Sequence, residues 1–161
     1  MGFEFFKIRA SEIGEVLRVQ ERAHAEFYQE KAESFISKIE ISPDTCFGAF
    51  LGDRLIGYGI SFPWFKDKVV NLDCSLNSIG EKPEILYIHD IAVDPDFRGL
   101  GIAKDLLDLM CHEATLLELS LLTLVAVAGS NTYWARHGFM RTECKVEGYG
   151  SGAMEMILTL K

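Results

Sequence analysis

One turn between an apolar strand and an amphipathic helix constrains the fold of this chain more than any other feature. The segment YIHDIAVDPDFRGLGIAKDLL, residues 87–107, starts as a strand, reaches an Asp-Pro pair, and enters a helix after an arginine and two glycines. A glycine at a helix start removes the side chain that would cover backbone N–H groups, and these groups have no partner within the helix. The segment therefore predicts an α/β fold in which a strand and a helix meet at a site where the backbone binds a ligand.

The turn also has the composition of an anion site. Arg98 carries a guanidinium fork that suits phosphate oxygens, and Gly99 and Gly101 stand next to the positive end of the following helix. A P-loop, G-x-x-x-x-G-K-[ST], does not match, and the dinucleotide motif G-x-G-x-x-G is incomplete because Lys104 replaces its last glycine. We interpret residues 98–103 as a pyrophosphate cradle; a tight turn that binds nothing is the alternative.

Hydrophobic periodicity predicts the other elements. Their order is mixed α/β, with a hairpin before the central strand and a long polar loop over residues 65–83. We expect a single domain over residues 1–161, because this length suffices for one core and is short for two. Strands are predicted near residues 3–10, 47–51, 55–62, 84–93, 121–127 and 153–160, and helices near 11–22, 28–39, 101–118 and 131–138.

Charge and hydropathy exclude some classes of partner. The formal net charge is -8, which argues against nucleic acid or an anionic membrane surface as the main partner and is compatible with a cationic substrate. The opening MGFEFFKIRA has none of the features of a signal peptide, and no apolar run reaches the length of a transmembrane helix. We therefore expect a cytoplasmic location.

The cysteines predict no metal site. Cys46, Cys74, Cys111 and Cys144 are widely separated, with no C-x-x-C pair and no histidine at ligand spacing. Buried or half-buried thiols are the interpretation that this pattern favours over zinc ligands.

The cradle and a second segment together resemble the GCN5-related N-acetyltransferase (GNAT) superfamily. Arg98, Gly101 and Ala103 match its R/Q-x-x-G-x-G/A signature, and AVAGSNTYWARHGF, residues 126–139, resembles its second conserved block. The order of elements fits over nearly the whole chain. The resemblance implies a GNAT-like fold: one domain with a mixed central sheet of about six to seven strands, about four flanking helices, and strands that splay at the cofactor site.

The same resemblance implies an activity. It implies an acetyl-CoA-dependent N-acetyltransferase that moves an acetyl group to a primary amine by direct attack in a ternary complex. The acceptor would be a small-molecule amine or an amine of a peptide or protein. A homodimer is possible because dimers are common in the family, but the sequence does not determine the oligomeric state. A non-catalytic acyl-CoA-binding sensor or regulatory module of the same fold is the alternative.

The resemblance further implies contacts to the cofactor. A β-bulge near Ile91 would splay this strand from residues 121–127, and the pantetheine arm would pair with backbone groups in the gap. Asn131 would bind the arm while also capping the helix start, and Trp134 would pack against the arm. The expected cofactor-binding residues are Ile91, Ala92, Val93, Arg98, Gly99, Leu100, Gly101, Ile102, Ala103, Asn131 and Trp134.

Transfer to an amine needs a base more than an acid, because an alkylamine of pKa near 10.4 is only about a thousandth neutral at pH 7. His89 is the candidate base, since an ordinary histidine pKa of about 6.5 suits proton uptake. Strand alternation points the Asp90 side chain to the face opposite His89, unless a bulge rotates it. Asp90 would anchor a substrate ammonium or bind a nearby polar group. Tyr133 or Tyr149 is the candidate acid, because Trp134 stands where the family often has a tyrosine; transfer without an acid also stays open.

Overall fold

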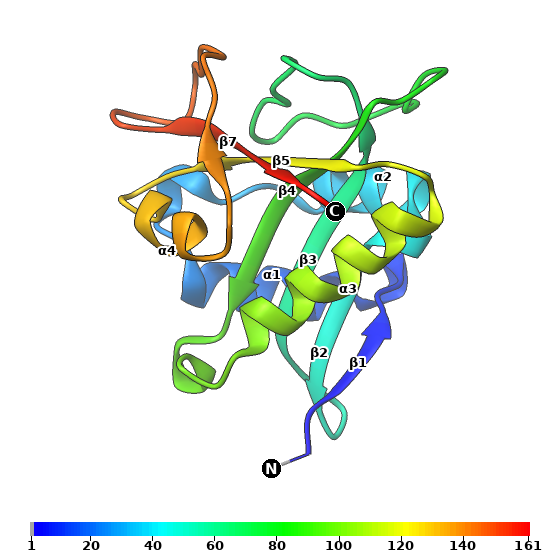
Figure 1. Ribbon diagram of the computed structural model, residues 1–161. Helices are drawn as coiled ribbons and strands as arrows, with labels where there is room; N and C mark the ends of the chain where they lie inside the picture. The colour runs from blue at the N-terminus through cyan, green and yellow to red at the C-terminus, as the bar shows by residue number, and fades with distance from the viewer. Residues whose placement is uncertain (1) are drawn as a thin grey trace.

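The computed structural model describes residues 2–161, which form one open sheet with helices on both faces (Figure 1). The seven strands lie in the order β1-β2-β3-β4-β5-β7-β6, and all neighbours are antiparallel except β4 and β5. The expected mixed sheet with about four helices is therefore confirmed. Within the described residues, no helix is both long enough and apolar enough to cross a membrane.

The elements follow the predicted order, with small shifts at their ends. The strands are β1 (Glu4–Lys7), β2 (Phe47–Leu51), β3 (Arg54–Trp64), β4 (Ile85–Val93), β5 (Leu121–Ala126), β6 (Met140–Arg141) and β7 (Met154–Thr159), and the helices are α1 (Ile13–Ala23), α2 (Ala32–Ile41), α3 (Ile102–Leu116) and α4 (Asn131–Arg136). The short strand β6 is an addition to the elements predicted from the sequence. Its two residues leave too little pattern for periodicity to detect.

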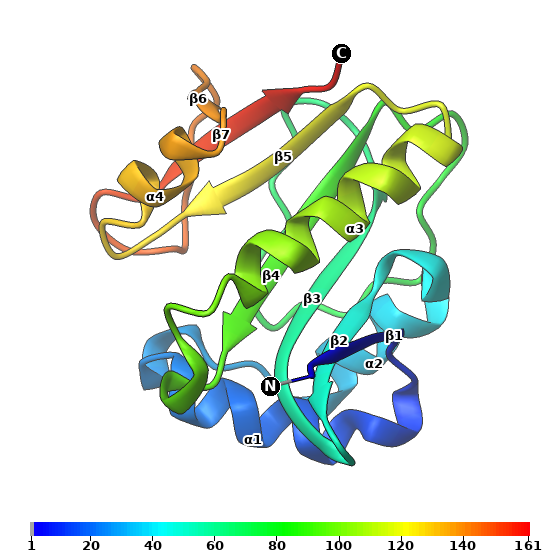
Figure 2. The ribbon, with the colours of Figure 1, turned by 60° about the horizontal axis from the view of Figure 1, so that its bottom comes forward.

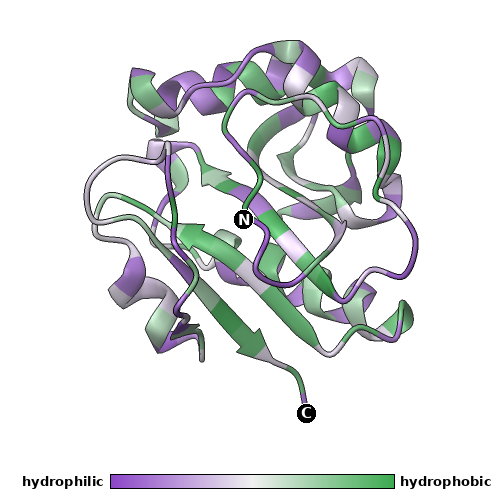
Figure 3. Cartoon of the chain, turned by 90° about the horizontal axis from the view of Figure 1, so that it is seen from above, coloured by the Kyte–Doolittle hydropathy of each residue, from purple (hydrophilic) through white to green (hydrophobic). Residues whose placement is uncertain are grey.

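Two apolar layers hold the helices on the sheet. Helix α3 packs on one face through Ile102, Leu106 and Met110, whereas α1 and α2 pack on the other face (Figure 2). The hydropathy colouring agrees, because the strands are mostly apolar and the helices alternate between apolar and polar residues (Figure 3). This alternation is the pattern of helices that bury one side and expose the other to water.

A β-bulge in β4 determines which side chains face α1 and α2. In the pairing with β3, Ile60 lies opposite Asp90 and Ser61 lies opposite Ile88, so His89 is the additional residue. The bulge therefore lies at His89 and not near Ile91, where we expected it. One additional residue interrupts the alternation of the strand, so the successive side chains of His89 and Asp90 both reach the α1–α2 face.

The parallel strands β4 and β5 separate after a short contact. Only Leu86 to Ile88 pair with Leu122 to Leu124, and beyond them the two strands diverge (Figure 2). The backbone of residues 89–93 on the β5 side is thus left without a strand partner. The splayed strands implied by the resemblance are present.

Candidate active site

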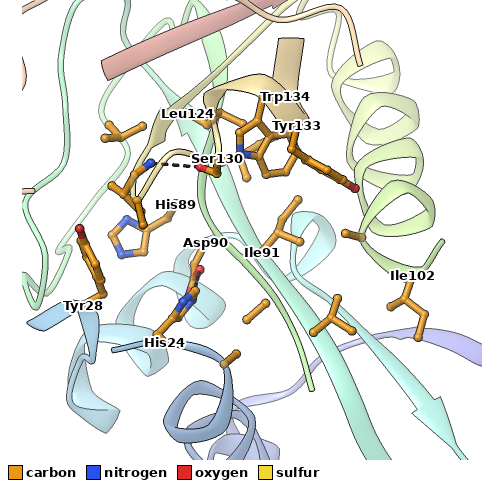
Figure 4. A pocket seen from close by; sticks show the side chains of 18 of the residues that line it. His24, Tyr28, His89, Asp90, Ile91, Ile102, Leu124, Ser130, Tyr133 and Trp134 are labelled. Atoms are coloured by element: carbon orange, nitrogen blue, oxygen red, sulfur yellow. Dashed lines mark hydrogen bonds and ion pairs between the residues drawn. The ribbon is translucent and has the colours of Figure 1, made fainter. Parts of the chain in front are cut away.

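A pocket of about 840 Å³ opens where β4 and β5 diverge. Its wall combines the end of β4, the start of α3, helix α4 and the connection between α1 and α2. Figure 4 shows His24 and Asp90 pointing toward each other on one side, while Tyr133 and Trp134 project from α4 on another. We call the part of the pocket at the start of α3 the cofactor side and the part at the α1–α2 connection the acceptor side, after the roles proposed below.

The glycine turn leaves its backbone N–H groups open. Gly99 and Gly101 have φ values of +79° and +81°, a conformation that other residues rarely adopt, and a Cβ at either position would meet empty space. Within residues 2–161, the amides of residues 99–104 donate to no carbonyl or side chain, and the first helical bond runs from Asp105 N–H to Gly101 O. The turn therefore has the open amides that a cradle needs, and binding of a pyrophosphate there stays a prediction.

A buried carboxylate holds the turn in place. Asp94, at the end of β4, is fully buried and its Oδ1 accepts from the N–H of Asp96 at 3.0 Å. Arg18, Arg22 and Arg54 reach its two oxygens at 3.5, 3.1 and 3.3 Å. Burial alone would raise the pKa of Asp94, but the Asp96 N–H and these guanidinium groups lower it. The start of the turn is therefore tied to α1 and β3.

The side chains expected at the cofactor are mostly at the pocket. Arg98 lines it and donates to the carbonyl oxygen of Ala23, the last residue of α1, at 3.3 Å. Trp134 also lines it. Leu100 has a half-exposed side chain and is not among the lining residues of the described chain, so it can contribute only its backbone.

Asn131 differs from its expected place. It is the first residue of α4, and the N-cap position belongs to Ser130, so the expected cap at Asn131 is wrong. The physical reason is a turn before the helix, in which the Ser130 hydroxyl accepts from the N–H of Val127 at 3.2 Å. Ser130 and not Asn131 is among the described residues that line the pocket. Contact between Asn131 and a cofactor stays a prediction.

His89 forms a buried pair with Glu30, which lies in the connection before α2. The Nε2 atom of His89 lies 3.0 and 2.8 Å from the two carboxylate oxygens of Glu30, and the two side chains are 0% and 2% exposed. Burial alone would raise the pKa of Glu30, but the hydrogen bond and charge of His89, with Ser34 and Lys38, lower it to about 2. Because a carboxylate only accepts, Nε2 carries the proton, and Nδ1 is the nitrogen left for proton uptake.

Asp90 has partners on both oxygens. His24 Nε2 lies 2.8 Å from Oδ1, and the Tyr58 hydroxyl donates to Oδ2 at 2.7 Å. The Asp90 carboxylate raises the pKa of His24 and outweighs the effect of burial. The sequence left two roles open for Asp90. The structure shows it as a partner to polar groups, and its role as an anchor for a substrate ammonium stays a prediction.

The two candidate acids have different surroundings. Tyr133 lines the pocket and packs edge-on against Trp134 and His137, with ring centroids 5.0 and 4.7 Å away. Burial raises the pKa of Tyr133. Tyr149 instead donates its hydroxyl to the carbonyl oxygen of Val70. Of the two candidate acids, Tyr133 is therefore the one whose hydroxyl is free of a hydrogen bond to another residue in the described structure.

Sequence reasoning missed the partners on the acceptor side. The sequence analysis assigned no role to His24 or Glu30, yet both contact β4 residues, across 66 and 59 positions of sequence. Tyr28 was also missed; its hydroxyl donates to Tyr149 O at 3.3 Å and joins the α1–α2 connection to the β6–β7 connection. No short-range motif marks these residues, because their role depends on the bulge and on loop packing.

Comparison with known families agrees with this geometry. The model of the acetyltransferase (GNAT) family matches residues 13–139, most of the chain. The chain therefore belongs to the acetyltransferase (GNAT) family, and acyl transfer is its general class of activity. A search of curated proteins found no match.

Solved structures of the same fold include enzymes with different reactions. The NatC complex bound to Gag peptide and CoA aligns with a TM-score of 0.77 and 17% identity over 100% of both chains. The PaiA N-acetyltransferase of Thermoplasma acidophilum, in complex with coenzyme A, aligns with a TM-score of 0.73 and 15% identity over 99% of both. A GNAT-like decarboxylase, GphF with isobutyryl-CoA, aligns with a TM-score of 0.78 and 11% identity over 98% of this chain and 100% of that chain. At sequence identities of 11 to 17%, the structural similarity shows that these proteins share a fold, and nothing about a shared substrate.

Proposed function

We propose that this protein is an acetyl-CoA-dependent N-acetyltransferase that acetylates a primary amine by direct attack in a ternary complex. The observation that supports this most is the row of unpaired amides at residues 99–104, which borders the same pocket as the His89–Glu30 pair. A pyrophosphate on those amides would satisfy donors that the helix start leaves open. The thioester would then extend along the gap between β4 and β5.

His89 is the proposed base. Glu30 holds its Nε2–H, which leaves the lone pair of a neutral ring on Nδ1, and this buried atom has no partner among residues 2–161. The acceptor ammonium would lose a proton to Nδ1, directly or through water, and the neutral nitrogen would attack the thioester carbonyl. The carbon–nitrogen bond forms and the carbon–sulfur bond breaks, with its electron pair going to the thiolate. The second nitrogen-bound proton passes to that thiolate, directly or through water, as the amide forms.

The remaining groups have supporting roles in this proposal. A backbone N–H near Ile91 would donate to the carbonyl oxygen as negative charge develops there, as in an oxyanion hole. The leaving thiol has an ordinary pKa near 8.5, so its thiolate departs without much help, and Tyr133 would supply only a modest gain as an acid. Asp90 would hold His24 and attract a cationic acceptor.

We infer the class of acceptor from the charge of the protein and from proteins of similar structure. Glu30 and Asp90 place two carboxyl groups on the acceptor side, each already held by His89 or His24, and the formal net charge of -8 favours a cationic acceptor over an anionic one. The NatC structure contains a peptide, which supports a peptide amine as one acceptor class. A small-molecule amine is the other.

The test has two parts. Thermal unfolding with and without acetyl-CoA tests the cradle, and release of free thiol across small amines and peptides with free N-termini tests turnover. Stabilisation together with amine-dependent thiol release is the expected result. Stabilisation with no release from any amine would favour the alternative, a non-catalytic acyl-CoA sensor, and no stabilisation at millimolar ligand would contradict both.

A further inference from the structure

A second group of reactive side chains lies apart from the active-site pocket. Asp67, Cys144 and Glu155 each bring one ligand atom to a common place, and these atoms all lie within 4.8 Å of one another. Asp67 belongs to the connection between β3 and β4, Cys144 to the connection between β6 and β7, and Glu155 to β7 itself. Three separate segments of the chain therefore meet at one point.

Glu155 is the member that needs explanation. It lies within the sheet opposite Val125 and is 2% exposed, and its Oε1 accepts from the Thr142 hydroxyl at 2.7 Å. Its Oε2 is buried and has no hydrogen-bond partner in residues 2–161. No lysine, arginine or histidine nitrogen of the described chain lies within 4.0 Å of this carboxyl group. A buried carboxyl oxygen without a partner is unfavourable, and a bound cation is one way to satisfy it.

Cys144 is placed by the same local network. Its N–H donates to the Thr142 hydroxyl at 3.1 Å, and that hydroxyl in turn donates to Glu155. Its Sγ lies within 4.8 Å of a carboxylate oxygen of Glu155 and of Asp67, and it donates to the carbonyl oxygen of Lys145 at 3.7 Å. The two carboxylates would repel a thiolate at this place, and a divalent cation among the three groups would reverse that effect.

We propose that Asp67, Cys144 and Glu155 form a binding site for a divalent transition metal of the zinc type, with water completing the coordination. A thiolate with two carboxylates selects a borderline-soft metal over magnesium or calcium, which prefer oxygen ligands alone. Zinc–sulfur bonds of about 2.3 Å and zinc–oxygen bonds of about 2.1 Å require the ligand atoms to approach one another. Asp67 is exposed and can make this movement.

The site would fasten one wall of the active-site pocket. Tyr149 follows Cys144 in the β6–β7 connection, lines the pocket, and donates to Val70 in the β3–β4 connection. A metal on Asp67 and Cys144 would add a second link between these two connections. Its binding does not depend on the proposed acetyl transfer, so the two proposals can fail separately.

Titration of the full chain with Co²⁺ tests the site, because a thiolate ligand gives a charge-transfer band in the near ultraviolet. We expect a band that saturates at one Co²⁺ per chain and that Zn²⁺ abolishes. Cys144→Ser should lose the band, whereas Cys74→Ser, which removes an exposed thiol elsewhere, should keep it. Asp67→Asn and Glu155→Gln should weaken Co²⁺ binding by at least about tenfold.

Three results would overturn the proposal. They are the absence of a band in the unmodified chain, a band that persists in Cys144→Ser, and a band that Cys74→Ser removes equally. Thermal unfolding of each variant without metal checks that it folds. Asp67→Asn changes an exposed side chain, so it keeps the test decisive if the buried Glu155→Gln variant does not fold.

Discussion

The cofactor side and the acceptor side of the pocket satisfy their polar groups in opposite ways. At the start of α3, the amides of residues 99–104 have no partner in the described chain. On the acceptor side, Glu30 holds His89, and His24 and Tyr58 hold Asp90, at 2.7 to 3.0 Å. The amides of the cofactor side gain hydrogen-bond partners only when a ligand supplies acceptors. The polar groups of the acceptor side are already paired with one another.

This difference teaches which interactions serve binding and which serve geometry. Unpaired amides contribute affinity because they exchange water for the ligand. A saturated network contributes precise placement, because each side chain is held by another before the substrate arrives. Variants on the acceptor side should therefore change turnover or stability, and variants on the cofactor side should change affinity for acetyl-CoA.

The largest effect should come from His89→Ala. Loss of the proposed base should lower turnover by about 10²- to 10⁴-fold, with acetyl-CoA affinity nearly unchanged, and should remove the limb of the pH–rate profile that reports the base. Steady-state kinetics across pH, with calorimetric titration of acetyl-CoA, measure both. His137→Ala is the matched control, since His137 lines the same pocket from the residue after α4. An unchanged pH profile in His89→Ala would exclude His89 as the base.

Glu30→Gln should lower the free energy of unfolding by about 3 kcal/mol at neutral pH, because it removes a buried carboxylate that accepts from His89 and lies 3.9 Å from the buried Lys38 ammonium. The direction in which this stabilisation changes with pH follows from the pKa of Glu30, which is lowered from 4.5 to about 2 on folding. This stabilisation is fully present above pH 4.5 and is lost as pH falls toward 2. Denaturant unfolding at several pH values should show the difference from wild type shrinking over that range. A difference that stays constant would contradict the assigned pair.

Gly101→Val should weaken acetyl-CoA binding by about tenfold to a hundredfold, because valine strains the left-handed turn and shields the amides. Gly52→Val is the matched control: Gly52 also has positive φ, +60°, and open space around it, but it lies in the β2–β3 hairpin. Both variants should lose stability, and only Gly101→Val should lose affinity in the thermal-shift titration. Equal affinity in the two would show that the amides do not bind the cofactor.

Asp90→Asn should return the pKa of His24 toward its ordinary value of 6.5, because the Asp90 carboxylate is the main cause of the increase. The stability that this pair contributes is fully present below pH 6.5 and is lost as pH rises through the folded pKa of His24. Nuclear magnetic resonance titration of the His24 ring measures the pKa directly. A pKa that stays raised in Asp90→Asn would mean that another group sets it.

The smallest effect should come from Tyr133→Phe. The leaving thiol has an ordinary pKa near 8.5, so loss of an acid should lower turnover by less than about tenfold. Thiol-release kinetics measure it, with Tyr149→Phe for comparison. A loss as large as that of His89→Ala would show that Tyr133 has more than the modest role proposed here.

The parts that could be predicted from sequence are those set by neighbouring residues. The strand, the glycine turn and α3 follow each other within residues 85–116, so periodicity and glycine placement suffice. The position of the bulge was missed by two residues, since it depends on register with β3, which no local pattern determines. His24 and Glu30 were missed for a similar reason: their β4 partners lie 66 and 59 residues away.

The three-residue contact between β4 and β5 has a consequence for the ligand-free protein. A sheet that opens at its centre carries two additional unprotected edges, and such edges accept any extended chain that can reach them. Under the proposed function, a bound coenzyme would cover both edges and so keep them from pairing with another chain.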